Sequence, residues 1–61
     1  MLKEIKREFK KYKDYGFSDV YFKNKTEPTK KAIEWMDSIG MGYECKIIPK
    51  KILHIRIRWQ T

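Results

Sequence analysis

The chain has 61 residues and a formal net charge of +7, from 15 lysines and arginines against eight acidic residues. That length allows one domain, residues 1–61, and a chain of this size buries only about 60% of its unfolded surface. Hydrophobic residues at 41% and nine aromatic rings are too many for a disordered chain.

The charge balance favours a polyanionic partner, nucleic acid first and an acidic protein second. No apolar run approaches the roughly 20 residues of a membrane span, so we expect no membrane association. Cys45 is the only cysteine, which excludes an internal disulfide and a cysteine-based zinc site. Together with a charged N-terminus, this predicts a protein of the reducing cytoplasm.

Residues 2 to about 14 have the spacing of an amphipathic helix. Its apolar face consists of Leu2, Ile5, Phe9 and Tyr12. One flank is basic and contains Lys3, Lys6, Arg7, Lys10 and Lys13. The other flank holds Glu4 and Glu8, so the charges are sorted by sign around the helix.

A strand is predicted from Phe17 to Lys23, after Gly16 ends the helix in the left-handed conformation. Its alternation places Val20 and Phe22 in the core. Tyr21 and Lys23 then point to the opposite side of the sheet. We call the side that faces away from the core the outer face.

A second helix is predicted from about Glu27 to Ile39. Thr26 is the expected N-cap, with Pro28 in the first turn, where proline is tolerated. Gly40 closes the helix. The expected apolar set is Ala32, Ile33, Trp35, Met36 and Ile39.

Two further strands, Tyr43–Ile48 and Ile52–Trp59, alternate strongly and are linked by the three residues 49–51. The inward sets are Tyr43, Cys45 and Ile47 on the first strand and Leu53, Ile55, Ile57 and Trp59 on the second. Matching these faces pairs Ile47 with Leu53, and it places Glu44 opposite Arg56 as a cross-strand ion pair. Cys45 is expected to be a small buried group.

The element order is helix, strand, helix, strand, strand. It predicts an α+β fold, a two-layer sandwich of a three-stranded sheet with both helices on one face. The first two strands should run parallel. The outer face then has no element left to cover it, and it serves either as a ligand platform or as a subunit interface.

The predicted nucleic-acid-binding residues lie on three parts of the chain. The outer face contributes Tyr21, Lys23, Lys46, His54, Arg56 and Arg58, the basic helix flank Lys3, Lys6 and Lys10, and the hairpin tip Lys50 and Lys51. Cations neutralise phosphates, and aromatic or guanidinium planes stack on bases. A solvent-facing strand is also commonly polar, so the same residues are compatible with a merely solvated surface.

No catalytic motif is present, and a lone His54 cannot form a metal site, so we expect no metal and no cofactor. The first hypothesis is a small nucleic-acid-binding protein, RNA or DNA, acting as a homodimer. The second is an accessory or inhibitor that docks on an acidic protein, of the kind that viruses and mobile elements encode. The third is a small ribonuclease toxin that uses His54.

Overall fold

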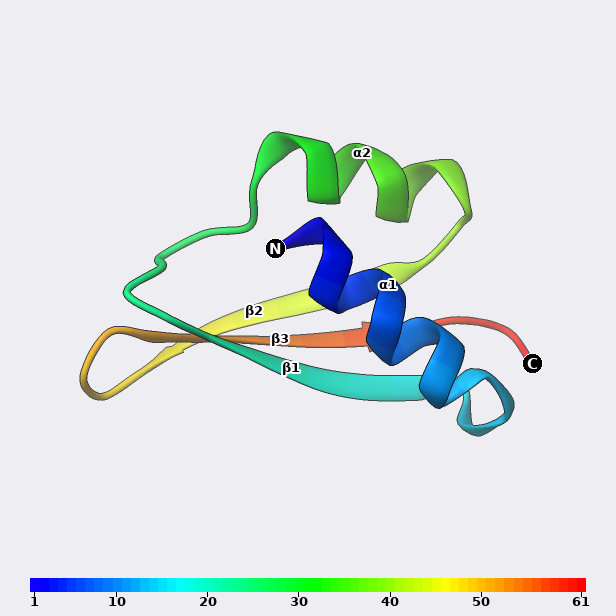
Figure 1. Ribbon diagram of the computed structural model, residues 1–61, viewed down its shortest axis with the longest axis horizontal. Helices are drawn as coiled ribbons and strands as arrows, with labels where there is room; N and C mark the ends of the chain where they lie inside the picture. The colour runs from blue at the N-terminus through cyan, green and yellow to red at the C-terminus, as the bar shows by residue number, and fades with distance from the viewer.

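The structure, a computed structural model, describes all 61 residues as two helices and a three-stranded sheet. The order is α1 (Leu2–Lys11), a 3-10 turn (Lys13–Tyr15), β1 (Phe17–Lys23), α2 (Lys30–Ser38), β2 (Gly42–Ile48) and β3 (Ile52–Arg58), as Figure 1 shows. The predicted α+β class and element order are confirmed. Neither helix is long and apolar enough to cross a bilayer.

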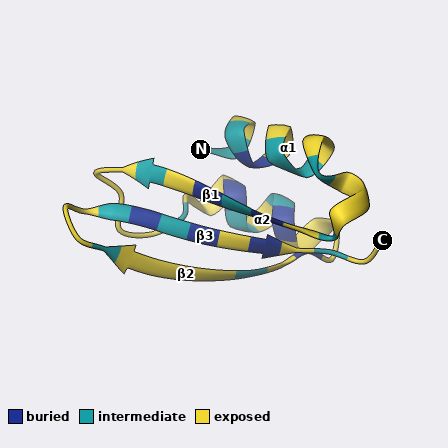
Figure 2. Ribbon diagram, turned by 90° about the horizontal axis from the view of Figure 1, so that it is seen from below, coloured by how far each residue is buried: buried dark blue, intermediate teal, exposed yellow.

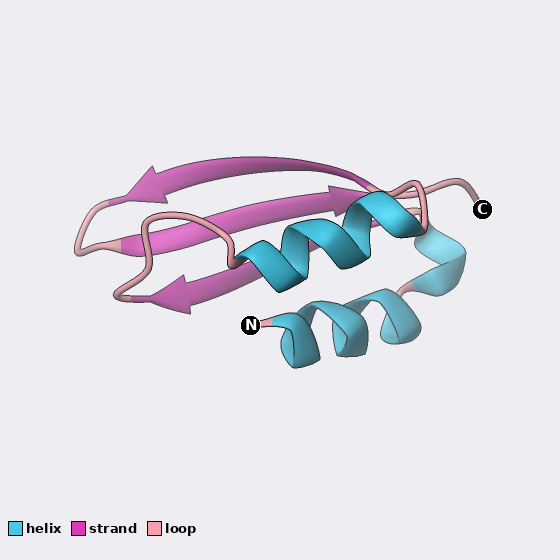
Figure 3. Ribbon diagram, turned by 90° about the horizontal axis from the view of Figure 1, so that it is seen from above, coloured by secondary structure: helices cyan, strands magenta, loops and turns pink.

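The sheet has the strand order β1-β3-β2, with β3 antiparallel to both neighbours. β1 and β2 are therefore parallel, as predicted, but they are separated by β3 rather than adjacent. Both helices lie on one side of the sheet, so the sandwich has two layers and the outer face is bare (Figure 3). The central strand is the last one, which shows why its alternation is the most regular in the chain.

The β2–β3 hairpin has the predicted register throughout, including Ile47 with Leu53 and Cys45 with Ile55. Residues 49–51 form the loop, where Lys50 and Lys51 have φ of 71° and 56°. Left-handed backbone is costly for residues with a Cβ. The pairing of two apolar faces therefore determines this register, and the loop adapts to it.

The helix boundaries differ from the prediction. α1 ends at Lys11 instead of near residue 14, and the chain tightens into the 3-10 turn before Gly16, whose φ is 83°. α2 begins at Lys30 and its N-cap is Thr29, so the prediction of Thr26 was wrong. Pro28 keeps the residue before it out of the helical region, and Thr29 Oγ1 accepts the hydrogen bond from the Ala32 amide at 3.2 Å.

The core lies between the helices and the inner face of the sheet. Its buried apolar residues are Ile5, Val20, Ala32, Met36, Met41, Leu53, Ile55 and Ile57. Trp59 adds to it at the chain end, where its ring packs edge-on against Phe9 and its Nε1 donates to the Lys13 carbonyl at 2.9 Å. These contacts anchor the C-terminal segment to α1 and to the 3-10 turn that follows it.

The helices do not cover the whole inner face. α1 packs on β1 and α2 contacts β2, yet β2 is exposed along most of its length (Figure 2). Ile47 is 51% exposed and Ile39 is 44% exposed, so neither is the core residue that its spacing predicted. Cys45 is exposed, and the prediction that it is buried was wrong. Two short helices are not wide enough to shield three strands.

Candidate nucleic-acid interface

The outer face is arranged in rows, because each β3 residue lies opposite one residue of β1 and one of β2. From one end of the sheet to the other, the rows are Phe17–Arg58–Gly42, Asp19–Arg56–Glu44, Tyr21–His54–Lys46 and Lys23–Ile52–Ile48. All six residues predicted for this face therefore lie on it together. The two middle rows carry most of its charged groups.

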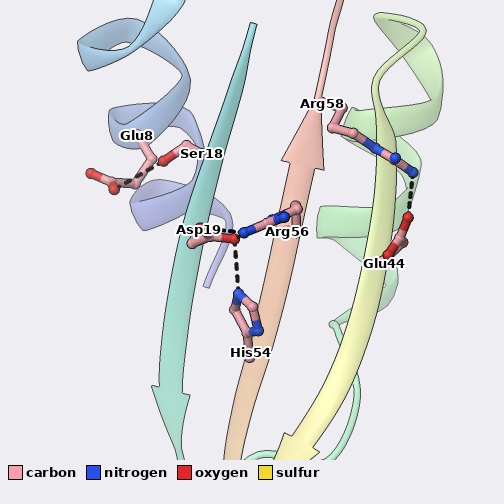
Figure 4. A network of polar contacts seen from close by, with 7 residues as sticks. All are labelled: Glu8, Ser18, Asp19, Glu44, His54, Arg56 and Arg58. Carbon is pink, nitrogen blue, oxygen red and sulfur yellow. Dashed lines mark hydrogen bonds and ion pairs between the residues drawn. The ribbon is translucent and has the colours of Figure 1, made fainter. Parts of the chain in front are cut away.

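Asp19 is the centre of a polar network on this face (Figure 4). Its Oδ1 accepts from Arg56 Nε at 2.8 Å, and its Oδ2 accepts from Arg56 Nη2 at 3.1 Å, so the guanidinium contact is bidentate. His54 Nε2 lies 2.8 Å from the same Oδ1. These contacts, that of Arg56 first, lower the pKa of Asp19 from 3.8 to about 2, since they favour the charged carboxylate.

Glu44 makes a different ion pair from the one predicted. It lies opposite Arg56 in the register, but its Oε1 contacts Arg58 Nη2 at 2.6 Å, one row away. Arg56 instead pairs with Asp19, whose two carboxylate oxygens accept from two of its guanidinium nitrogens. Contact with Asp19 also raises the pKa of Arg56, so this arginine keeps its charge.

Two aromatic rings of β1 stand on the outer face, and both are largely open to solvent. Tyr21 is 57% exposed and Phe17 is 48% exposed. The Tyr21 ring stacks on the His54 imidazole, with centroids 4.7 Å apart and planes 8° from parallel. The Arg56 guanidinium carbon lies 5.8 Å from the centroid of the Phe17 ring. Exposed rings beside cations are the groups on which nucleobases stack.

The electrostatic balance of this face is less positive than its arginines suggest. Lys23, Lys46, Arg56 and Arg58 stand against Asp19 and Glu44, and both carboxylates contact an arginine. The two arginines are thus partly neutralised within the protein. Lys23 and Lys46 are exposed and form no ion pair.

The basic flank of α1 lies elsewhere. Its exposed cations Lys3, Lys6, Arg7 and Lys10, which we call the α1 patch, line a shallow hollow that contains no carboxylate. Lys6 Nζ lies 5.6 Å from the centroid of the Trp35 ring of α2, on the helix layer. Glu8, on the opposite flank, accepts from Ser18 of β1 at 3.2 Å. The α1 patch therefore lies on the helix layer, apart from the outer face, and forms a separate basic surface.

Lys50 and Lys51 lie at the tip of the hairpin, beside the last row of the outer face. The Asn24 amide donates to the Lys51 carbonyl at 2.8 Å, which joins this tip to the end of β1 that carries Lys23. These three lysines therefore gather at one end of the sheet. They can extend the outer face in the direction of the strands.

Two residues of the site were not identified from the sequence. Phe17 and Asp19 alternate with Tyr21 along β1 but were not included in the predicted binding surface. The signal was available, since both alternate with the core residues of β1 in the same way as Tyr21. No group of three or more histidine, cysteine or acidic side chains is placed to hold a metal ion. No protein-family model, curated protein or solved structure matches the chain.

Proposed function

We propose that the protein binds single-stranded nucleic acid on the outer face of its sheet. The observation that carries the proposal is the uncovered sheet with two half-exposed aromatic rings, Phe17 and Tyr21, standing among cationic side chains. An apolar ring exposed on a strand has no core to stabilise it, and base stacking is worth about 1–3 kcal/mol per base. The same ring type on a sheet surface serves RNA recognition in other folds.

Each part of the face has a role in this proposal. Tyr21, already stacked on His54, offers its free side to a base, and Phe17 offers a second stacking position two rows away. Lys23 and Lys46 contact phosphates, because they are the cations without a carboxylate partner. Arg58 contacts phosphate after its exposed ion pair with Glu44 opens. Backbone and stacking contacts of this kind give little sequence preference.

The α1 patch supplies a second phosphate surface in the other layer. Its hollow is lined by four cations and no carboxylate, which is more positive charge than lines any other hollow of the surface. Phosphates prefer such unpaired cations, since no internal ion pair has to be broken. A strand bound on the outer face can reach this surface only around the edge of the sheet. The two surfaces therefore contribute separately to affinity.

Fluorescence-anisotropy titration of single-stranded and duplex oligonucleotides, in RNA and DNA forms, tests the proposal. We expect binding of single strands that weakens steeply from about 50 to 200 mM salt, since each phosphate contact releases counterions. Tyr21→Ala with Phe17→Ala should weaken binding by about 30-fold or more for two lost stacking contacts. The salt slope should not change, because neither ring carries charge.

Matched variants separate the two surfaces. Lys23→Ala with Lys46→Ala removes two charges from the outer face, and Lys3→Ala with Lys10→Ala removes two from the α1 patch. Lys25→Ala with Lys30→Ala removes two exposed charges outside both surfaces. Equal losses of affinity in all three double variants would show that binding depends on net charge alone. No binding at low salt would contradict the proposal and direct attention to an acidic protein partner, sought by pull-down after nuclease treatment.

A second candidate function is ribonuclease activity, and the contact between His54 and Asp19 favours it. A carboxylate that orients an imidazole is a recurrent part of acid–base catalysis. Cleavage of a fluorogenic RNA by the wild-type chain, abolished by His54→Ala, would support this candidate. Binding without cleavage leaves His54 as a support for the Tyr21 ring.

A further inference from the structure

The free edge of β2 carries apolar surface that the helices leave uncovered. Cys45 and Ile47 point to the inner side of the sheet, yet both are exposed, and Ile39, the residue that follows α2, is exposed in the same layer. The other edge differs, because the inward Ser18 and Val20 of β1 are buried beneath α1. An edge strand with open apolar side chains is a template for pairing with another strand.

The unpaired backbone groups of this edge follow from the hydrogen bonds of β3. The Trp59 amide donates to the Gly16 carbonyl and the Asn24 amide donates to the Lys51 carbonyl, so the odd-numbered positions of this strand face β1. Its even-numbered positions must then face β2. In the β2 register, this leaves the N–H and C=O groups of Tyr43, Cys45 and Ile47 directed to the open edge.

We propose that β2 pairs antiparallel with β2 of a second copy of the chain, about a two-fold axis at Cys45, to form a six-stranded sheet. The axis lies at the midpoint of Gly42–Ile48, so every residue of the strand gains a partner. The pairs are Cys45 with Cys45, Tyr43 with Ile47, Glu44 with Lys46 and Gly42 with Ile48. A two-fold interface requires such a self-complementary surface.

Charge selects this register over its neighbours. With the axis at Cys45, each Glu44 lies opposite Lys46 of the other copy on the outer face. Moving the axis to Glu44 would place two glutamates opposite each other, and moving it to Lys46 would oppose two lysines. Like charges directly opposite destabilise a sheet, and opposite charges stabilise it.

The apolar side chains are matched as well. On the inner side, the Tyr43–Ile47 pairs flank the Cys45 pair and cover the side chains that are exposed in the single chain. Because the axis is perpendicular to the sheet, both helix layers lie on the same side. The two outer faces join into one continuous surface, which makes the pairing an extension of the sheet rather than a cover over it.

The first test is the oligomeric state of nuclease-treated protein, which does not depend on nucleic-acid binding. Sedimentation from about 1 µM to 1 mM should show a mass of twice the 7.5 kDa chain at the upper end. Ile47→Lys should remain monomeric over that range and folded, since Ile47 is half-exposed in the single chain. A monomeric wild-type chain at all concentrations would overturn the proposal.

The register is tested by a charge exchange. Lys46→Glu places two carboxylates opposite each other in both symmetric pairs and should raise the dimer dissociation constant by about tenfold. Glu44→Lys with Lys46→Glu restores opposite charges and should recover most of that loss. If neither Ile47→Lys nor either charge variant changes the dimer dissociation constant, the dimer uses another surface and the proposal fails.

The single cysteine gives a second readout of the same axis. Opposed residues in a hydrogen-bonded antiparallel pair have Cα atoms about 5.5 Å apart, a distance that a disulfide spans. Partial burial raises the pKa of the Cys45 thiol, so oxidation with diamide belongs at alkaline pH. Wild-type chains should crosslink much faster than Cys45→Ser with Lys10→Cys, whose exposed thiol on α1 reports random collision. Equal rates would contradict an axis at Cys45.

Discussion

Replacement of Asp19 by asparagine is the most informative single change on the outer face. The amide has the same shape and can still accept one hydrogen bond, but it carries no charge. The substitution therefore removes the negative charge that faces Arg56 and His54 while leaving the backbone of β1 in place. We expect it to change stability and binding in opposite directions.

The effect on stability follows from the pKa of Asp19. A decrease from 3.8 to about 2 corresponds to at most ~2.5 kcal/mol, at about 1.4 kcal/mol per pKa unit. The side chain is 26% exposed, and solvent screens part of this, so we expect Asp19→Asn to lower the free energy of unfolding by about 1–2 kcal/mol at pH 7. In a domain of this size, that loss lowers the melting temperature by about 5–15 °C.

The stabilisation by Asp19 should decrease as the pH falls. The folded state holds Asp19 at a lower pKa than the unfolded chain, so the unfolded chain takes up the proton first as the pH falls. The stabilisation is complete above the ordinary value of 3.8 and is lost as the pH decreases to about 2. The difference between wild-type and Asp19→Asn should therefore close over this interval.

The effect on binding follows from the guanidinium that Asp19 releases. Arg56 becomes free to contact phosphate or to stack on a base, and the outer face gains one positive charge. Affinity for a single strand should increase several-fold, and the salt slope should steepen by about 0.7 for one added phosphate contact. Stability would thus decrease while affinity increases.

Urea unfolding at pH 7 and at steps down to pH 2, together with anisotropy titration at several salt concentrations, measures both effects. Glu44→Gln is the matched control, because it removes the other carboxylate of this face from a well-exposed pair with Arg58. It should increase affinity but change stability by less than ~0.5 kcal/mol. If Asp19→Asn stays folded and binds more weakly, Asp19 positions Arg56 for the ligand, and our account of neutralised arginines is wrong.

Three further changes test the local structure. Thr29→Ala should cost about 1 kcal/mol by urea unfolding because it removes the N-cap of α2, while Thr26→Ala, at the cap predicted from sequence, should cost almost nothing. Gly16→Ala should lower the melting temperature, since φ is 83° and the added Cβ lies 3.2 Å from Thr61 Cγ2. An unchanged melting temperature would contradict the strain expected of a left-handed alanine. Lys50→Gly should raise the free energy of unfolding by about 0.5 kcal/mol. The gain from relieving a lysine in the left-handed conformation exceeds the loss from the greater freedom of glycine in the unfolded chain. A lower free energy of unfolding would show that Lys50 is not strained.

The sequence predicted the sheet better than the helices. Strict alternation in the strands determines which side chains are inward, and a shift by one residue would bury arginines, so the alternation excludes a one-residue slip of the β2–β3 register. Helix ends carry weaker signals. Thr26 and Thr29 are both plausible caps, and only the constraint that Pro28 imposes on its neighbour decides between them.

The exposure of β2 could not be predicted from its pattern. Cys45 and Ile47 alternate like core residues, and they do point to the inner side, but burial also requires an element above them. How far two short helices extend over a sheet is decided by their packing, which periodicity does not encode. The ion pairs could not be predicted from the pattern either. Asp19 is known to lie opposite Arg56 only when β1 is known to be the neighbour of β3.

The edge and the outer face are linked through Lys46 and Glu44. In the paired sheet, Lys46 of one copy lies opposite Glu44 of the other, so the second copy competes with Arg58 for that glutamate. Each lysine that pairs in this way releases an arginine to the solvent, and the number of free cations on the joined surface stays the same. Dimerisation would therefore double the area available to a strand without neutralising it, and the salt slope per bound dimer should be twice that of the monomeric Ile47→Lys chain.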